Sequence, residues 1–269
     1  MTTLHAMPEL DERASFELFA AHYDAFTDHP GHHDWFRRLE ALARRHGLSG
    51  KRALDVGCGT GKSTLALIEL GYEVIGCEPC EPMLAAAVDK LGDRATLVHA
   101  SAEALPDLGE FDYIACVNDV CNYILDAERL GAAFRAMAAN LADDGILLFD
   151  ANTPAIYFEF FAPARVSESP AGKLVWHGAK LDEFSANEIV ETTIDFFEPE
   201  GDLWRHRAVR HAQRHYDHDT IEALLADAGL RIEALYGQTD AGPPEQPVDP
   251  DRHIKAIYLA RRQPSRRAI

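Results

Sequence analysis

The chain has 269 residues, of which 44 are Asp or Glu and 26 are Lys or Arg, so its formal net charge is −18. Nucleic-acid and anionic-lipid partners both require dense Lys and Arg, so this balance argues against binding nucleic acid or a membrane surface. Hydrophobic residues make up 47%, as in an ordinary globular protein that is long enough to bury a large core.

The first twenty residues are acidic and contain neither a basic start nor a continuous apolar run, so we expect no signal peptide. No stretch approaches the roughly 18 apolar residues of a membrane helix. The five cysteines are an odd number in a large chain, which fits a reducing compartment better than a disulfide framework. These features predict a cytoplasmic protein.

In chain order, the first fifty residues carry apolar side chains at helical spacing, interrupted by a predicted turn at 28–31. From residue 53 onward, short apolar strands alternate with helices. The predicted strands are 53–56, 73–77, 95–99, 113–117 and 146–149, and the predicted helices are 62–70, 81–91 and 127–141. This alternation is typical of βαβ units with a parallel sheet.

Residues 151–216 break this pattern, because they contain strand-like runs and no clear helix. A helix then follows at 221–228, with Asp219 as its expected N-cap and Gly229 after its end, before two last strands at 232–236 and 254–260. We therefore predict an α/β fold with a doubly wound, mostly parallel seven-stranded sheet and an antiparallel insertion. The predicted units are N-terminal helices over the ligand site (1–50), a core (51–150 and 217–261), an insertion that covers a substrate (151–216) and a basic tail (262–269).

The segment 55–61, Asp-Val-Gly-Cys-Gly-Thr-Gly, joins the first strand to the first helix of the sheet. A phosphate-binding loop would need glycine at position 56, which is Val56. A dinucleotide site prefers G-x-G-x-x-G, whereas the glycines here alternate strictly. Asp55 also places negative charge beside the turn, which suits a cationic ligand group better than a pyrophosphate.

With the motifs that follow it, this segment resembles the first motif of class I S-adenosylmethionine (SAM) dependent methyltransferases. Glu78-Pro79-x-x-Met83 follows the second strand, residues 100–106 resemble the adenine-edge motif, and 149–153 resemble small-molecule enzymes with an insertion after strand five. Ser101 stands where the family usually has Asp. The resemblance implies a Rossmann-like methyltransferase fold and these cofactor-binding residues: Tyr23, Asp55, Gly57, Cys58, Gly59, Gly61, Glu78, Pro79, Met83, Ser101, Ala102, Glu103 and Asn118.

Candidates for catalysis must lie after strands four and five or on the insertion. They are Asp119, Tyr123, Asn152 and His211. Each also has a purely structural interpretation, as a helix cap, a pocket wall, a turn residue and a core histidine respectively. No spacing of His, Cys and carboxylates predicts a metal site.

We expect a SAM-dependent methyltransferase that methylates N or O, less readily C, of a small-molecule acceptor and releases S-adenosylhomocysteine (SAH). The alternatives are a peptide-directed methyltransferase, a non-catalytic SAM-binding protein and an NAD-dependent oxidoreductase. An exposed edge of the antiparallel insertion would allow a homodimer.

Overall fold

The computed structural model describes residues 14–20, 23–27, 32–181, 184–239 and 242–264. The predicted turn at 28–31 and the last five residues of the basic tail lie outside these ranges. Among the described helices, none has the length and apolar character needed to cross a membrane.

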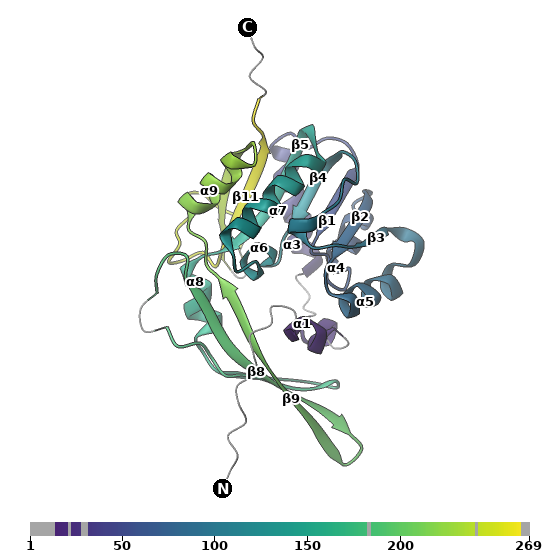
Figure 1. Cartoon of the computed structure of the whole chain (residues 1–269), viewed down its shortest axis with the longest axis vertical. Helices are drawn as coiled ribbons and strands as arrows, with labels where there is room; N and C mark the ends of the chain where they lie inside the picture. The colour runs from purple at the N-terminus through teal and green to yellow at the C-terminus, as the bar shows by residue number, and fades with distance from the viewer. Residues whose placement is uncertain (1–13, 21–22, 28–31, 182–183, 240–241, 265–269) are drawn as a thin grey trace.

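The centre of the molecule is a seven-stranded sheet in the order β10-β11-β5-β4-β1-β2-β3 (Figure 1). Its strands are β1 (Arg52–Val56), β2 (Glu73–Glu78), β3 (Thr96–His99), β4 (Phe111–Cys116), β5 (Leu141–Asn152), β10 (Leu230–Gln238) and β11 (Lys255–Arg262). The first five are mutually parallel, and β11 is antiparallel to both β5 and β10. The predicted fold class is confirmed.

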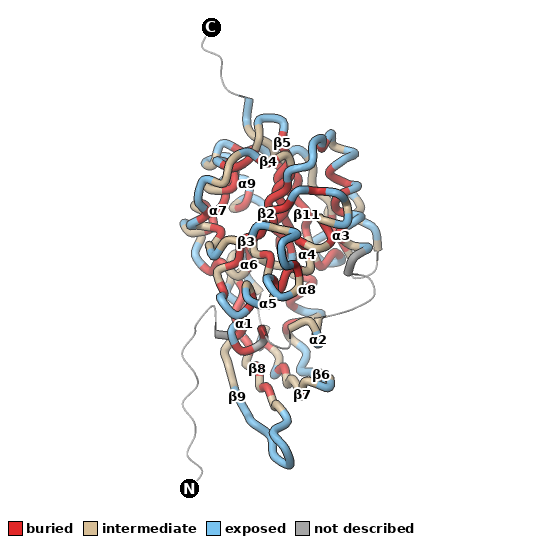
Figure 2. Tube along the Cα trace, turned by 90° about the vertical axis from the view of Figure 1, so that its right-hand side faces the viewer, coloured by how far each residue is buried: buried red, intermediate tan, exposed pale blue. Residues whose placement is uncertain are grey.

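Apolar side chains alternate between the two faces of this sheet, which is why helices cover both. On β5, Ile146 and Leu148 belong to the cluster under α3 (His32–Arg45) and α4 (Lys62–Glu69). The intervening Leu147 and Phe149 belong to the cluster under α7 (Ala127–Asn140) and α9 (His218–Asp227). Figure 2 shows this buried layer running through the middle of the molecule.

Two details of the core differ from the sequence-based prediction. The strand β5 begins at Leu141, so the predicted turn at 143–145 lies within it, where its pairing with β4 shifts register. The N-cap of α9 is Asp217, whose side chain accepts from the Thr220 N–H at 2.9 Å, and Asp219 is already inside the helix.

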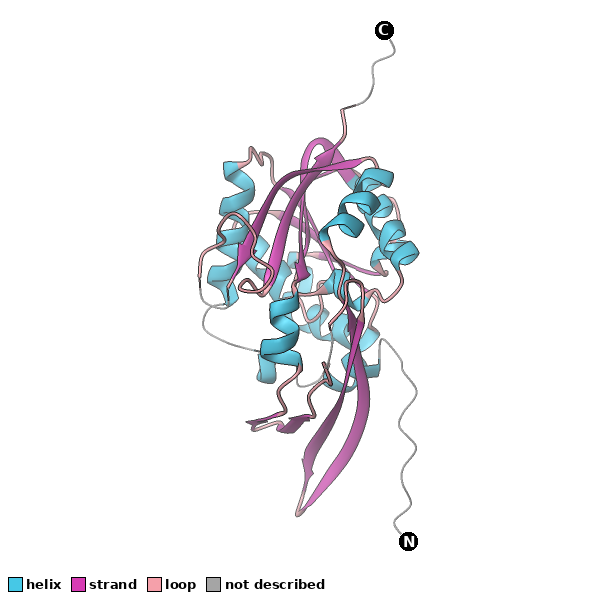
Figure 3. Cartoon of the chain, turned by 90° about the vertical axis from the view of Figure 1, so that its left-hand side faces the viewer, coloured by secondary structure: helices cyan, strands magenta, loops and turns pink. Residues whose placement is uncertain are grey.

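The insertion forms a second, antiparallel sheet in the order β6-β7-β8-β9. Its strands are β6 (Arg165–Ser169), β7 (Gly172–Trp176), β8 (Ile189–Glu200) and β9 (Leu203–Arg214). Figure 3 shows the long β8–β9 hairpin projecting away from the core. The expectation that the insertion contains no helix was wrong, because α8 (Pro154–Ile156) and a π-helical turn, η3 (Tyr157–Phe161), precede β6.

Short helices lie around the carboxyl ends of the parallel strands. They are α1 (Ala14–Phe19), α2 (Tyr23–Thr27), α6 (Val120–Tyr123), the 3-10 turn η2 (Ala102–Ala104) and the start of α5 (Glu81–Leu91), which leads through the 3-10 turn η1 (Gly92–Arg94) back to the amino end of β3. Contacts join α1 to both α5 and β9, so α1 lies between the core and the insertion (Figure 1). This arrangement leaves a space at the edge where open α/β sheets bind their ligands.

Candidate active site

A pocket opens where β1, β2 and β4 end, beside the point at which the strand order reverses. The pocket is lined by every predicted cofactor residue except Asp55 and Gly61: Tyr23, Gly57, Cys58, Gly59, Glu78, Pro79, Met83, Ser101, Ala102, Glu103 and Asn118. The structure therefore brings together residues from six separate segments of the chain.

The glycine-rich turn lets the backbone form part of the pocket wall. Gly57 has φ +74°, and a Cβ there would lie 2.5 Å from Val120 Cγ2. Gly59 also has positive φ, but nothing lies within 4 Å of where its Cβ would be. Glycine at 57 is thus needed for close packing, whereas glycine at 59 leaves room on the open side of the turn.

Asp55 does not face the pocket, contrary to the expectation of negative charge at its mouth. Only 1% of the residue is exposed, and Oδ2 accepts hydrogen bonds from Ser63 Oγ and Thr64 Oγ1, both at 2.6 Å. Burial raises the pKa of Asp55 to about 6, against the effect of these two hydroxyls. Asp55 therefore ties the glycine-rich turn to the start of α4.

Glu78 is the pocket carboxylate nearest the glycine-rich turn. Its Oε2 accepts from the Gly59 N–H at 3.0 Å, and its Oε1 accepts from the Cys80 N–H at 2.9 Å. Burial raises the pKa of Glu78, while the two backbone N–H groups oppose that rise. Each carboxylate oxygen retains accepting capacity for a ligand hydroxyl.

On the far side of the pocket, Glu103 is fixed by Arg129, whose Nη2 lies 2.6 Å from Oε1. Burial alone would raise the pKa of Glu103, but the hydrogen bond and charge of Arg129, together with bonds from the Glu103 backbone and Ser101, outweigh it and lower the pKa. Met83 is 2% exposed and supplies an apolar wall beside Cys80. This end of the pocket thus combines an apolar surface with fixed polar groups.

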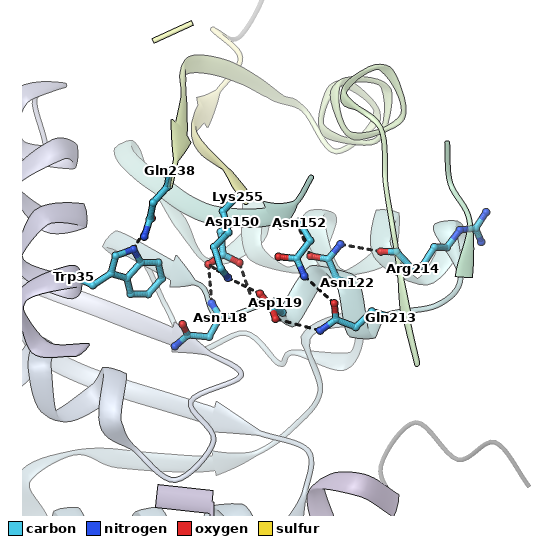
Figure 4. A network of polar contacts seen from close by, with 10 residues as sticks. All are labelled: Trp35, Asn118, Asp119, Asn122, Asp150, Asn152, Gln213, Arg214, Gln238 and Lys255. Carbon is cyan, nitrogen blue, oxygen red and sulfur yellow. Dashed lines mark hydrogen bonds and ion pairs between the residues drawn. The ribbon is translucent and has the colours of Figure 1, made fainter. Parts of the chain in front are cut away.

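Beyond β4, a polar network joins Asp119 to distant strands (Figure 4). Lys255 Nζ pairs with Asp119 Oδ1 and lies 3.0 Å from Asp150 Oδ2. Gln213 Nε2 donates to Asp119 Oδ2 at 3.1 Å. Burial would raise the pKa of Asp119, but Lys255 and Gln213 outweigh it and lower the pKa, so this carboxylate is held ionised.

Asp150 braces the turn that presents Asp119. Its two oxygens accept the N–H groups of Asn118 and Asp119 at 2.8 and 2.9 Å. Both of those residues have positive φ, 65° and 70°, a region that Asn and Asp tolerate better than most residues with a Cβ. Burial raises the pKa of Asp150, partly offset by Lys255.

The predicted residues Tyr123 and His211 are neighbours, with ring centroids 5.4 Å apart. Tyr123 lines the pocket, and His211 is 8% exposed on β9 among Phe161, Trp176 and Tyr123. Burial lowers the pKa of His211 to about 4, so the imidazole is neutral near pH 7. The core and the insertion therefore meet at an aromatic wall beside the pocket.

Asn152 extends the network to the end of β5. Its Nδ2 donates to Gln213 Oε1 at 2.7 Å, so Gln213 bridges Asn152 and Asp119. The Asn152 Oδ1 and the Tyr157 hydroxyl are buried without a hydrogen-bond partner. Such orphaned atoms are rare in native proteins and are often satisfied by a ligand or water.

Sequence reasoning missed several contributors. Among them, Thr60, Lys62 and Arg129 line the pocket, and Lys255 and Gln213 hold Asp119. Gln213 had a usable signal, because it stands two residues after His211 on the same strand and therefore on the same face. Among the described residues, no group of three or more His, Cys, Asp and Glu is arranged to hold a metal ion.

The seven-stranded sheet with its reversed last strand, and a pocket between the glycine-rich turn and the carboxylate at the end of β2, are those of the class I methyltransferase fold. Residues 53–145 match the family model of the methyltransferase domain. Over 239 residues the chain is 29% identical to a protein of Geobacillus sp. (strain WCH70) that bears a provisional methyltransferase name, covering 86% of this chain and 95% of the relative.

Two further comparisons extend across the insertion. The chain is 27% identical over 205 residues to dTDP-3-amino-3,6-dideoxy-alpha-D-glucopyranose N,N-dimethyltransferase of Streptomyces fradiae, covering 74% of this chain and 77% of the relative. The fold of the present chain matches the crystal structure of a SAM-dependent methyltransferase from Clostridium acetobutylicum. The TM-score is 0.75 at 22% identity, and the match covers 93% of this chain and 99% of the Clostridium chain. The chain thus carries a methyltransferase domain on the class I fold and is a methyltransferase whose cofactor is SAM.

Proposed function

We propose that this enzyme transfers the methyl group of SAM to a nitrogen atom of a small-molecule amine held between the cofactor pocket and the insertion (151–216). The observation that carries the proposal is the ionised Asp119 beside Tyr123 and the neutral His211. A carboxylate and an uncharged imidazole together suit an acceptor that arrives as an ammonium ion and must lose a proton.

The pocket residues fit SAM. The Glu78 oxygens would accept both ribose hydroxyls, and a carboxylate there disfavours a pyrophosphate. Met83 and Pro79 would pack on the adenine, with Ser101, Ala102 and Glu103 at its edge. The turn 57–59, Tyr23 and Asn118 would hold the methionine end. In this assignment Asp55 and Gly61 act indirectly, by shaping the turn.

When bound, SAM supplies a methyl group on a sulfonium, which leaves as the neutral thioether of SAH. The protein therefore contributes mainly orientation, worth up to about 7–11 kcal/mol. Asp119 would bind the acceptor ammonium, the neutral His211 would accept a hydrogen bond from the acceptor once its proton has passed to solvent, and Tyr123 would wall the methyl-transfer position. The unpartnered Asn152 Oδ1 would accept a hydrogen bond from the acceptor.

Nitrogen is favoured over oxygen by the extent of the similarities. The match to the Streptomyces fradiae N,N-dimethyltransferase spans 74% of the chain. The chain is 38% identical to a ubiquinone biosynthesis O-methyltransferase of Aromatoleum aromaticum, but over only 85 residues. A hydroxyl acceptor is the second candidate, because this shorter match has the higher identity.

The test is a turnover screen with SAM against small amines, including aminosugar nucleotides, each paired with the alcohol that replaces the amine. Mass spectrometry should show methylation of an amine and not of its paired alcohol. On that substrate, Asp119→Asn should lower kcat/KM about 10–150-fold while SAM affinity changes by less than about threefold. Turnover of alcohols alone would contradict the assignment of nitrogen.

A further inference from the structure

The short helix α2 is attached to the rim of the cofactor pocket through one carboxylate, that of Asp24. Its Oδ1 accepts from Thr60 Oγ1 at 2.6 Å, and its Oδ2 lies 2.6 Å from Lys90 Nζ. Lys62 Nζ lies 3.6 Å from Oδ1. The three partners come from the glycine-rich turn, α5 and α4, so Asp24 joins three elements around the pocket.

The partners of Asp24 also bond to one another. Lys90 Nζ donates to Thr60 Oγ1 at 3.1 Å, and Lys62 Nζ donates to Thr27 Oγ1, at the other end of α2, at 3.1 Å. Burial alone would raise the pKa of Asp24, but the bonds from Lys90 and Thr60 outweigh it and lower the pKa. Asp24 therefore carries its charge throughout the neutral range.

This cluster determines where Tyr23 lies. Tyr23 precedes Asp24, lines the cofactor pocket and packs against Cys80 and Met83. Removal from solvent, followed by the charges of Asp119 and Glu78, raises the pKa of Tyr23 to about 12, so it presents a neutral hydroxyl. Thr60 and Lys62 line the same pocket.

We propose that Asp24 is a positioning residue: its ion pairs with Lys62 and Lys90 hold Tyr23 against bound SAM and so set the rate at which SAM and SAH leave. The inference rests on the assignment of Tyr23 to the cofactor under "Proposed function". Release requires Tyr23 to move away, and Tyr23 cannot move far without separating Asp24 from its two lysines. Because 43% of the Asp24 side chain is exposed, salt should weaken these pairs.

The dissociation rate of radiolabelled SAM, measured by rapid dilution into excess unlabelled SAM, tests this role. Asp24→Asn keeps the size of the side chain and its acceptor for Thr60 but removes the charge. We expect dissociation about 10-fold faster, with the association rate changed by less than about twofold. Raising the ionic strength from about 0.05 to about 0.5 M should speed release from the wild type about threefold and barely affect the variant.

A second variant keeps the test independent of the folding of α2. Lys90 lies on α5, and Lys90→Met should speed the release of SAM about threefold. Adding Lys90→Met to Asp24→Asn should have little further effect, because both substitutions remove the same ion pair. The matched control is Lys173→Met on β7, which removes the ion-pair partner of Glu168 and should leave the rate of SAM release unchanged.

The outcomes separate the two ideas. A wild type that retains no SAM overturns the cofactor assignment and this inference together. A wild type that binds SAM, with Asp24→Asn releasing it at the same salt-dependent rate, overturns only the positioning role of Asp24. Additive effects of Asp24→Asn and Lys90→Met would also overturn it.

Discussion

The cofactor side and the acceptor side of this site each contain a carboxylate at the end of a parallel strand, but the two are held differently. Glu78 is bound by backbone N–H groups of its own neighbourhood, and its pKa is raised. Asp119 is bound by side chains from β9 and β11, and its pKa is lowered. One charge is supported locally, whereas the other depends on residues far along the chain.

The difference reflects what each side must recognise. The proposed cofactor site needs only a turn and a carboxylate from one βαβ unit, β1-α4-β2. The proposed acceptor site would draw on the core and the insertion, since Asp119 is held by Lys255 on the last strand and by Gln213 on the insertion. The predictions below address this contrast.

The largest effect is expected for Lys255→Met, which leaves Asp119 and Asp150 without their shared lysine. Removing one partner of a buried ion pair costs about 3–5 kcal/mol, so the free energy of unfolding in urea at about pH 7 should fall by that amount. Lys173→Met, which breaks an exposed pair, should cost below about 1 kcal/mol. If Lys255→Met lowers the free energy of unfolding as little as the control does, then Asp119 and Asp150 do not depend on Lys255.

The pH dependence sharpens this prediction. In the wild type the lowered pKa of Asp119 contributes stability that is complete above its ordinary pKa and is lost as pH falls through the lowered one. Without Lys255, burial would raise the pKa of both carboxyl groups, so their unfavourable charge would disappear as pH falls. The difference in free energy of unfolding between Lys255→Met and the wild type should therefore become smaller from about pH 7 to about pH 5.

On the cofactor side, Glu78→Ala should remove the charged acceptor for two ribose hydroxyls. The expected cost is about 1.5–3 kcal/mol, which is a fall in SAM affinity of roughly 10–150-fold by calorimetry. Glu81→Ala, three residues away with its side chain 82% exposed, is the matched control and should bind as the wild type does. Unchanged affinity in a folded Glu78→Ala variant would rule out the ribose assignment.

His211 should make the acceptor side sensitive to acid. Its pKa of about 4 lies below the ordinary 6.5, so the unfolded chain binds this proton more readily and stability falls as pH drops below 6.5. Between about pH 7 and about pH 5 the contribution is about 2 kcal/mol. Over the same pH range, the free energy of unfolding in urea should therefore fall by about 2 kcal/mol less for His211→Gln than for the wild type. If both proteins show the same pH profile, His211 is not a buried neutral imidazole.

The smallest effect is expected on the outer hairpin, away from both sides of the site. Arg207 pairs with Glu198 across β8 and β9, with 43% of its side chain exposed. Arg207→Met should change the free energy of unfolding by less than about 0.5 kcal/mol. A loss above about 1.5 kcal/mol would mean that the hairpin depends on these surface pairs.

The sequence predicted most of the residues that line the pocket because they follow from local patterns. Strand ends meet at one edge of a parallel sheet, so residues that follow strands, such as Glu78, Ser101 and Asn118, fall together without further information. Asp55 is the instructive exception. It shares the face of Ala53, two residues earlier on the strand, and that face lies under α4.

The acceptor side was predicted only as a set of candidates, because its arrangement depends on tertiary contacts. Lys255 is 136 residues from Asp119 along the chain, and Gln213 is 94 residues away. No local pattern specifies which distant strand supplies the counterion. The π-helical turn η3 was likewise not predicted, because its sequence is rich in aromatic residues, which are common in β-strands.

The position of α2 has a thermodynamic consequence. Tyr23 faces the cofactor pocket, while Phe26, one turn further on, meets Phe196 of β8 edge to face at 5.6 Å. A single small helix thus contacts both binding regions. If acceptor binding shifts the insertion, the shift is transmitted to Tyr23, and reciprocity requires SAM to tighten acceptor binding by the same factor by which acceptor tightens SAM. Such coupling would favour an ordered sequence, in which the spent cofactor dissociates only after the methylated product has gone.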